Sequence, residues 1–209
     1  MSVRGLDDLS RVALLTIECQ NGVINPDFSG DEGLPGECAR RDIVSHIARL
    51  SARCRELSIP VFHSTLAHRP DWAGSNVNSA LLRRNQKLHK MIAGTDETLL
   101  HPGLGATSDD FVLERMHGVT AFYNSALDQL LRNCDVRTII VAGVSTNLGI
   151  PAAAIEAVNR GYTVIVPEDC TAGVWPEAHQ FVIEQFLPPL AVVTSSEAIL
   201  EHLAAAHAA

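Results

Sequence analysis

The feature that most constrains the fold is a strand, a tight turn and a helix in direct succession within residues 138–162. Residues 138–142 form a short apolar run rich in β-branched side chains, which predicts a buried strand of a parallel sheet. A polar turn over 143–147 follows, and Thr146, Asn147 and Pro151 mark the start of an alanine-rich helix. Such a unit places backbone N–H groups at the carboxyl edge of a sheet, where open α/β proteins bind ligands.

Apolar runs of this kind alternate with helical patterns six times along the chain. This alternation predicts an α/β fold of three αβα layers, in which helices cover both faces of an open, mostly parallel, six-stranded sheet. Residues 22–36 carry several glycines and two prolines, which predicts a surface loop, and 73–108 is irregular apart from a helix near 79–90. A length of 209 residues with 46% hydrophobic side chains suits one domain over residues 1–209.

Composition excludes several classes of protein. The formal net charge is -8 and no basic run exceeds two residues, so a nucleic acid would be repelled. The first residues lack the apolar core of a signal peptide, and no apolar run approaches the roughly 20 residues that span a bilayer. We therefore expect a cytoplasmic protein with no membrane or nucleic-acid partner. The five cysteines are an odd number without paired metal spacing, which predicts free, reduced thiols.

Two charged residues stand where predicted strands end. Glu18 closes the apolar run 11–18, and Arg115 follows the run 110–114. Both therefore belong to the carboxyl edge of the sheet, although a strand-capping glutamate and a solvated arginine are the simpler alternatives. Adjacent side chains of a strand point to opposite faces, so Cys19 should face a covering helix if Glu18 faces the site.

Three stretches together resemble the isochorismatase-like hydrolases. These are Glu18-Cys-Gln-Asn21, Arg115 with Thr120-Ala-Phe122, and Gly143-Val-Ser-Thr-Asn-Leu-Gly-Ile150. The family carries a catalytic aspartate, lysine and cysteine in these stretches, whereas this chain has Glu18, Arg115 and Gly149. The resemblance covers nearly the whole chain and implies a Rossmann-like strand order. A dinucleotide-binding alternative fails because residues 18–22 lack the glycine-rich phosphate turn.

The resemblance also implies a site. The Val144-Ser145 peptide bond should be cis, and the backbone N–H groups of Ser145 and Gly149 should form an oxyanion hole. Substrate-binding positions fall on four aromatic or imidazole side chains near the strand ends: His68, Trp72, His117 and Phe122. Metal-binding relatives carry Asp-x-His where this chain has Leu66 and a lone His68, so we expect neither a metal nor a cofactor. The family further implies a homodimer or homotetramer.

The missing cysteine argues against an amidase that forms a covalent thioester, because Gly149 offers no nucleophile. Some isochorismatases also resemble this chain in having glycine there, and they cleave a vinyl ether. In that reaction Glu18 would be the general acid and Arg115 would hold a substrate carboxylate, although an unneutralised Arg115 would weaken Glu18 as an acid. Two alternatives remain open: a ligand-binding protein without catalysis, and a hydrolase of amides or esters that uses Cys19 or an activated water.

Overall fold

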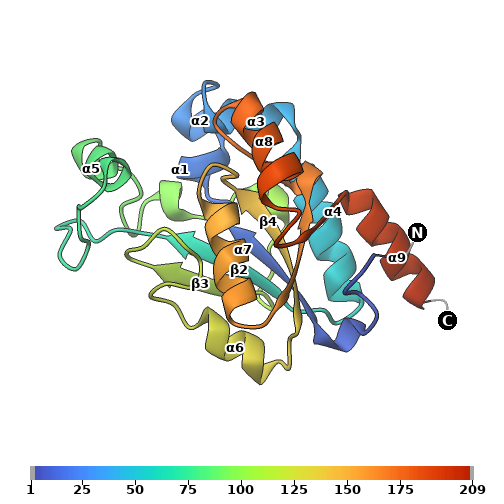
Figure 1. The fold of residues 1–209 in the computed structure, drawn as a ribbon. Coiled ribbons are helices and arrows are strands. Elements are labelled where there is room, and N and C mark those ends of the chain that lie inside the picture. Colours follow the sequence, from blue (N-terminus) through green and yellow to red (C-terminus); the bar gives the residue numbers. More distant parts are fainter. Residues whose placement is uncertain (1–2, 208–209) are drawn as a thin grey trace.

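Six parallel strands form the centre of the computed structural model, which describes residues 3–207 (Figure 1). Their order across the sheet is β3-β2-β1-β4-β5-β7, which confirms the predicted α/β fold and its Rossmann-like order. A further strand of two residues, β6, pairs with β4 and was not predicted. The bounds are β1 Val12–Ile17, β2 Val61–Leu66, β3 Phe111–Arg115, β4 Thr138–Val144, β5 Thr163–Pro167, β6 Thr171–Ala172 and β7 Val192–Thr194.

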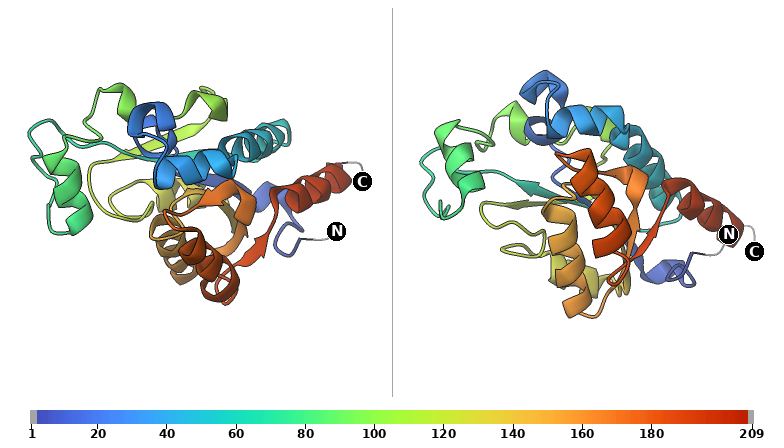
Figure 2. Two further views of the ribbon diagram at one scale, coloured as in Figure 1. Left: turned by 90° about the horizontal axis from the view of Figure 1, so that it is seen from above. Right: turned by 45° about the horizontal axis from the view of Figure 1, so that its top comes forward.

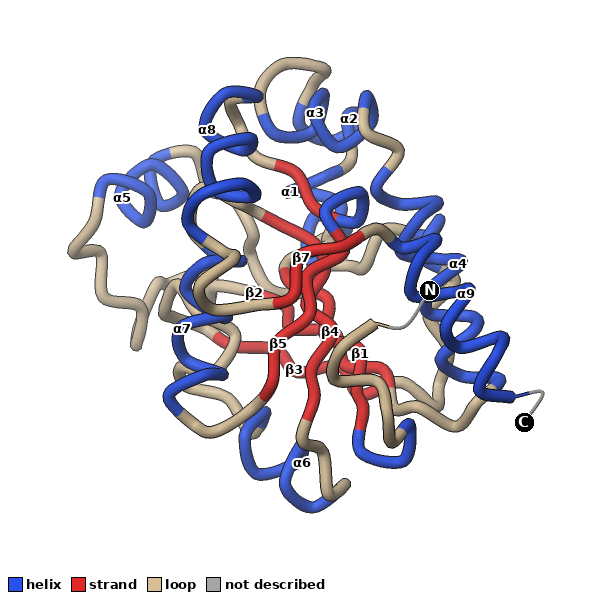
Figure 3. Tube along the Cα trace, turned by 45° about the vertical axis from the view of Figure 1, so that its right-hand side comes forward, coloured by secondary structure: helices blue, strands red, loops and turns tan. Residues whose placement is uncertain are grey.

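Helices cover both faces of the sheet, so that the molecule has three layers (Figures 2 and 3). One face packs against α4 (Ile43–Glu56) and α9 (Ser196–His207), and the other against α6 (Leu127–Asn133) and α7 (Gly149–Asn159). Strand β1 feeds both cores, because Leu14 belongs to the first cluster while Leu15 and Ile17 belong to the second. Alternating side chains of one buried strand thus explain its continuous apolar run.

The segment predicted as a surface loop over 22–36 instead contains helical turns. They are α1 (Asn21–Ile24), α2 (Pro26–Ser29) and the start of α3 (Leu34–Arg40). Asn25 caps α2 by accepting a hydrogen bond from the Asp27 amide at 3.0 Å, and Pro26 occupies the first helical position. These local capping contacts outweigh the surrounding glycines, so the loop prediction was wrong here.

Between β2 and β3 the chain makes a long excursion that projects from one side of the molecule (Figure 1). Its helix α5 (Ala80–Lys87) lies where predicted and begins at Ser79, which accepts a hydrogen bond from the Leu82 amide at 3.2 Å. Single 3-10 turns follow at Asp96–Thr98 and Pro102–Leu104. Gln20 holds the base of the excursion, because its amide donates to the carbonyl oxygens of Leu66 and Thr98 at 2.9 and 2.7 Å.

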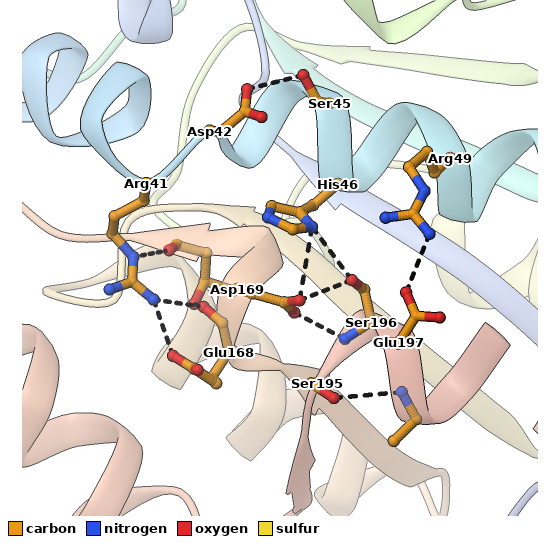
Figure 4. A network of polar contacts seen from close by, with 12 residues as sticks. Arg41, Asp42, Ser45, His46, Arg49, Glu168, Asp169, Ser195, Ser196 and Glu197 are labelled. Atoms are coloured by element: carbon orange, nitrogen blue, oxygen red, sulfur yellow. Dashed lines mark hydrogen bonds and ion pairs between the residues drawn. The ribbon is translucent and has the colours of Figure 1, made fainter. Parts of the chain in front are cut away.

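After β5 a polar network joins the sheet to the last helix (Figure 4). The Asp169 carboxylate accepts hydrogen bonds from the amide and hydroxyl of Ser196 at 2.7 and 2.6 Å, at the start of α9. Asp169 is therefore a structural hydrogen-bond acceptor. The chain between these elements forms α8 (Pro176–Phe181), which continues as a π-helical turn over Val182–Phe186. None of the described helices is long and apolar enough to cross a membrane.

Candidate functional site

A pocket of about 520 Å³ opens at the carboxyl ends of the central strands. Its floor includes Glu18 after β1, Leu66 at the end of β2, and Ser145 and Gly149 after β4. Its walls come from the α1–α3 segment, from α5, from Val119 and from the Val174-Trp175 pair before α8. The pocket thus lies at the sheet edge where the sequence predicts the site.

Glu18 and Arg115 form an ion pair on the pocket floor. Nη2 of Arg115 donates to the Glu18 carboxylate, while Nη1 donates to the Thr65 carbonyl at 3.1 Å and lies 3.4 Å from the Ser64 hydroxyl. The Arg115 side chain is fully buried, whereas that of Glu18 is 23% exposed. Glu18 therefore faces the pocket, and Arg115 lies behind it.

This arrangement corrects the expected role of Arg115. A guanidinium that is buried and already paired with Glu18 does not reach a substrate carboxylate. Glu18 follows β1 and Arg115 ends β3, and these two strands flank β2. Leu66 at the end of β2 is in register with Arg115, so both charged residues lie at the same edge of the sheet.

The turn after β4 contributes backbone groups. The Val144-Ser145 peptide bond is cis, and Ser145 and Gly149 both line the pocket. The Ser145 carbonyl accepts hydrogen bonds from the amides of Leu148 and Ile150 at 3.0 Å each. Among the described residues, the N–H groups of Ser145 and Gly149 have no acceptor. Two unpaired donors are therefore available beside Glu18.

At Gly149 the structure leaves no room for a side chain. A Cβ atom added there would lie 2.7 Å from the Val144 carbonyl oxygen and 3.5 Å from the Ile17 side chain. The first distance is too short for a carbon and an oxygen that are not bonded, and the oxygen belongs to the backbone. A cysteine at 149 therefore requires the turn to move.

Comparison with known proteins shows the family of the chain. A model of the isochorismatase domain matches residues 12–198. The chain belongs to the isochorismatase family. YecD of Escherichia coli, an uncharacterized isochorismatase family protein, is 30% identical over 193 residues, which cover 91% of this chain and 95% of YecD.

A further relative and a solved structure indicate how far the likeness extends. The ureidoacrylate amidohydrolase RutB of Methylorubrum extorquens is 27% identical over 185 residues, 83% of this chain and 74% of that protein. A cysteine hydrolase from Pseudomonas syringae pv. phaseolicola has a TM-score of 0.86 at 22% identity, over 98% of this chain and 97% of that chain. The second likeness supports the fold alone.

In this isochorismatase-family chain, hydrogen bonds join the turn after β4 to the residues before and within α8. The Asn147 side chain accepts a hydrogen bond from the Val174 amide at 2.6 Å, and the Thr146 hydroxyl lies 3.1 Å from Nδ1 of His179. Burial, followed by the charge of Arg41, lowers the pKa of His179 to about 4. The side chains expected to cap α7 thus hold the turn to its neighbour, and the helix begins at Gly149.

Cys19 lies outside the isochorismatase-like pocket. Its side chain is completely buried in the core beneath α4, with Sγ 3.5 Å from the Ile17 carbonyl. Burial, and then the charge of Glu18, raises the pKa of this thiol to about 12. The prediction that Cys19 faces away from Glu18 is confirmed, and the hypothesis that Cys19 is a nucleophile is wrong.

The structure does not bring His68, Trp72 or Phe122 to this pocket. His68 is buried, stacks on Trp72 at 4.1 Å between ring centres, and lies 3.1 Å from the Met116 carbonyl through Nδ1. Phe122 belongs to the core beneath α6 and α7. Nearness to a strand end in the sequence does not fix where a loop side chain points. His117 lines a separate, smaller pocket, described below.

Several wall residues lie in segments without a recognisable motif. Arg84 on α5 and Trp175 before α8 line the pocket, although they lie far from the family motifs. The one available hint was the Trp175-Pro176 pair, a bulky side chain before a helix-starting proline. Within residues 3–207, no group of three or more His, Cys, Asp or Glu side chains is placed to hold a metal ion.

Proposed function

We propose that this member of the isochorismatase-like hydrolase family hydrolyses a small amide or ester with water as the nucleophile. Glu18 is the general base, and the N–H groups of Ser145 and Gly149 bind the oxyanion. The observation that carries the proposal is the Glu18–Arg115 ion pair beside two unpaired N–H donors, at a turn without space for a nucleophilic side chain. RutB supports an amide-type bond, because it is an amidohydrolase.

In the first step, water lies between the Glu18 carboxylate and the substrate carbonyl carbon. Its oxygen forms the new bond to carbon, its proton passes to Glu18, and the carbonyl electron pair moves onto oxygen, facing the Ser145 and Gly149 amides. In the second step, the electron pair on the oxyanion re-forms the carbonyl, and the carbon–nitrogen or carbon–oxygen bond breaks as Glu18 gives its proton to the leaving nitrogen or oxygen. A carboxylic acid and an amine or alcohol are released, and the Glu18 carboxylate is restored.

Arg115 is a positioning residue in this proposal. Its guanidinium donates a hydrogen bond to the Glu18 carboxylate from behind the pocket. Burial against the Thr65 carbonyl and the Ser64 hydroxyl fixes the guanidinium, so the carboxylate is held at one place on the floor. An arginine suits this task because it stays charged at any physiological pH.

The crowding at Gly149 also favours a second candidate, acid-assisted cleavage of a vinyl ether, which needs no nucleophilic side chain. In that route a protonated Glu18 gives its proton to the enol-ether carbon, and water adds to the resulting cation while its proton passes back to Glu18. The hemiketal then breaks its carbon–oxygen bond, which releases an alcohol and leaves a carbonyl compound.

One experiment separates these routes. Amides, esters and vinyl ethers are offered to the wild-type protein and to Glu18→Gln, with products identified by mass. The base route gives turnover of the amide or ester, and the acid route gives turnover of the vinyl ether. Glu18→Gln should lose about 10² to 10⁴ in rate in either case. Ligand binding without any turnover would instead establish a binding protein.

The pocket wall further favours a substrate with an anionic group, such as a carboxylate. Arg84 lines the pocket, is exposed, and makes no side-chain hydrogen bond or ion pair with the described residues. Lys90 lines it too, but is paired with Glu97 at 2.7 Å. Arg84 is thus the better candidate to meet a substrate anion from the wall, in place of the buried Arg115.

Self-association is part of the proposal, as a homodimer or homotetramer. Large apolar side chains are exposed along α7 and α8, among them Ile155 at 40%, Trp175 at 62% and Phe181 at 60%. Such a surface is unusual for a monomer. Sedimentation over a range of concentrations tests this point, and a purely monomeric protein would refute it.

A further inference from the structure

A second, smaller pocket of about 250 Å³ adjoins the main one. Four residues line both cavities: Ser79, Leu82, Gly118 and Val119. The two cavities are therefore neighbouring chambers with a shared wall, formed by the start of α5 and the chain after β3. The side pocket lies on the far side of this wall from Glu18, which lines only the main pocket.

The side pocket is walled mainly by apolar surface. Leu82, Val119 and the Tyr123 ring face it, and Tyr123 is held edge-on to His117 with 6.0 Å between ring centres. Its imidazole and carboxylate groups already have partners. Nδ1 of His117 accepts a hydrogen bond from the Asn76 amide at 3.3 Å, and Glu156 pairs with Arg160. A bound group therefore meets hydrocarbon and aromatic surface rather than a free charge.

Gly118 forms the boundary between the chambers with backbone alone. Its φ of 95° is in the left-handed region, and a Cβ atom there would lie 2.5 Å from the Tyr123 ring. Glycine is thus required at this point, since any other side chain would meet the ring in a strained conformation. Because the position is glycine, no side chain from it blocks passage between the chambers.

We propose that the side pocket binds an apolar acyl substituent of the substrate, while the scissile bond lies at Glu18 in the main pocket. This inference rests on the proposed function. A volume of 250 Å³ equals about eight water molecules at about 30 Å³ each, which is room for a short aliphatic chain or one aromatic ring. The substrate class is then an amide or ester whose acyl part ends in an apolar group.

The test varies acyl length and obstructs the side pocket alone. Asn78 lines the side pocket but not the main one, whereas Gln86 on the same α5 segment lines neither, and neither side chain makes a hydrogen bond with the described residues. Asn78→Trp therefore adds bulk to the side pocket, and Gln86→Trp is the matched control. Acetyl, butyryl, hexanoyl and octanoyl amides are compared by kcat/KM. Binding of the corresponding carboxylates is measured by calorimetry, which needs no turnover.

We expect affinity and kcat/KM to rise about fourfold per added methylene until the chain fills the pocket. Asn78→Trp should flatten this gradient, and Gln86→Trp should preserve it. A binding gradient without turnover would remove the proposed function and leave this inference standing. Turnover with no dependence on chain length would overturn the inference alone. An equal loss of the chain-length gradient in Asn78→Trp and Gln86→Trp would also overturn the inference. So would self-association that is lost only in Asn78→Trp, because a second copy of the chain would then occupy the side pocket.

Discussion

The two halves of the pocket floor are built in opposite ways. On the side of β1 and β3, charged side chains define the site, because Arg115 is buried and pairs with Glu18. On the side of β4, the site depends on side chains that are absent. A Cβ at Gly143 would lie 2.4 Å from the Ile17 carbonyl oxygen, and one at Gly149 would lie 2.7 Å from that of Val144. The first half can be changed by altering charge, and the second only by moving the backbone.

The largest effect is expected on the charged half. Arg115→Gln removes the cation that holds Glu18, so we expect kcat to fall by about 10² or more, as when a transition-state group is misplaced. The lost ion pair should also lower the free energy of unfolding by about 1 to 3 kcal/mol, less than for two fully buried charges because Glu18 is partly exposed.

The matched control for Arg115→Gln is Arg84→Gln on the pocket wall. It should raise KM for anionic substrates and leave the free energy of unfolding unchanged, because Arg84 is exposed and unpaired among the described residues. Full kinetics and denaturant unfolding measure both variants. If Arg115→Gln retained the wild-type kcat, the charged half would be structural only.

The next effect is expected from a substitution on the β4 side of the floor, where glycines are required. Gly149→Cys forces the Val144 carbonyl to move, so we expect a loss of roughly 1 to 3 kcal/mol in unfolding free energy. If the thiol is accommodated, the helix start and Arg115 should lower its pKa below the free value of about 8.5. Alkylation rates against pH, with and without Arg115→Gln, measure this. If the thiol pKa stayed at its free value and did not change with Arg115→Gln, residue 149 and Arg115 would not belong to one site.

The next effect, which appears only at acidic pH, concerns His179 behind the turn that follows β4. His179 has a pKa of about 4 in the folded protein, against about 6.5 when unfolded, so the unfolded chain binds more protons between these values. Stability from this group is present above pH 6.5 and is lost as pH falls towards 4, at up to about 1.4 kcal/mol per pH unit. His179→Gln should remove this slope. An identical pH dependence of unfolding in both proteins would contradict the assignment.

The smallest effect is expected from alkylation of the cysteines, of which Cys19 lies in the core beneath the charged half. Iodoacetamide should leave activity intact, because burial raises the pKa of Cys19 to about 12 and that of Cys54 likewise. Cys134 is the most accessible thiol of the five and should react first. If alkylation of Cys19 inactivated the protein and substrate protected it, Cys19 would belong to the site and not to the core below the charged floor.

Sequence reasoning succeeded where a local pattern determines the structure. The apolar runs identified β1 and β4, and the ends of predicted strands located Glu18 and Arg115. These results depend on backbone periodicity, which is written into neighbouring residues. Cys19 also lies on the opposite side from Glu18, but strand alternation is not the reason. Glu18 follows β1 with a φ of 51°, so Cys19 joins the core beneath α4 and not the core that contains Ile17.

It failed where distant contacts decide. Whether Arg115 faces the pocket or lies behind Glu18 depends on three adjacent strands, and the burial of His68 depends on stacking against Trp72. The pocket walls from α5 and Trp175 come from segments with no motif of their own. The Val144 carbonyl that crowds Gly149 depends on backbone angles that composition does not reveal.

The crowding at Gly149 has a historical consequence. A single base change converts the glycine codons GGT and GGC to cysteine codons, so the mutational path from such a codon to a cysteine at this position is short. The folded chain closes that path, since the new side chain would collide with the Val144 carbonyl before it could be useful. Compensating changes in the turn would have to come first, and alone they would bring no benefit. Chains with this turn should therefore rarely acquire a cysteine at this position, and their chemistry should diversify through the pocket walls instead.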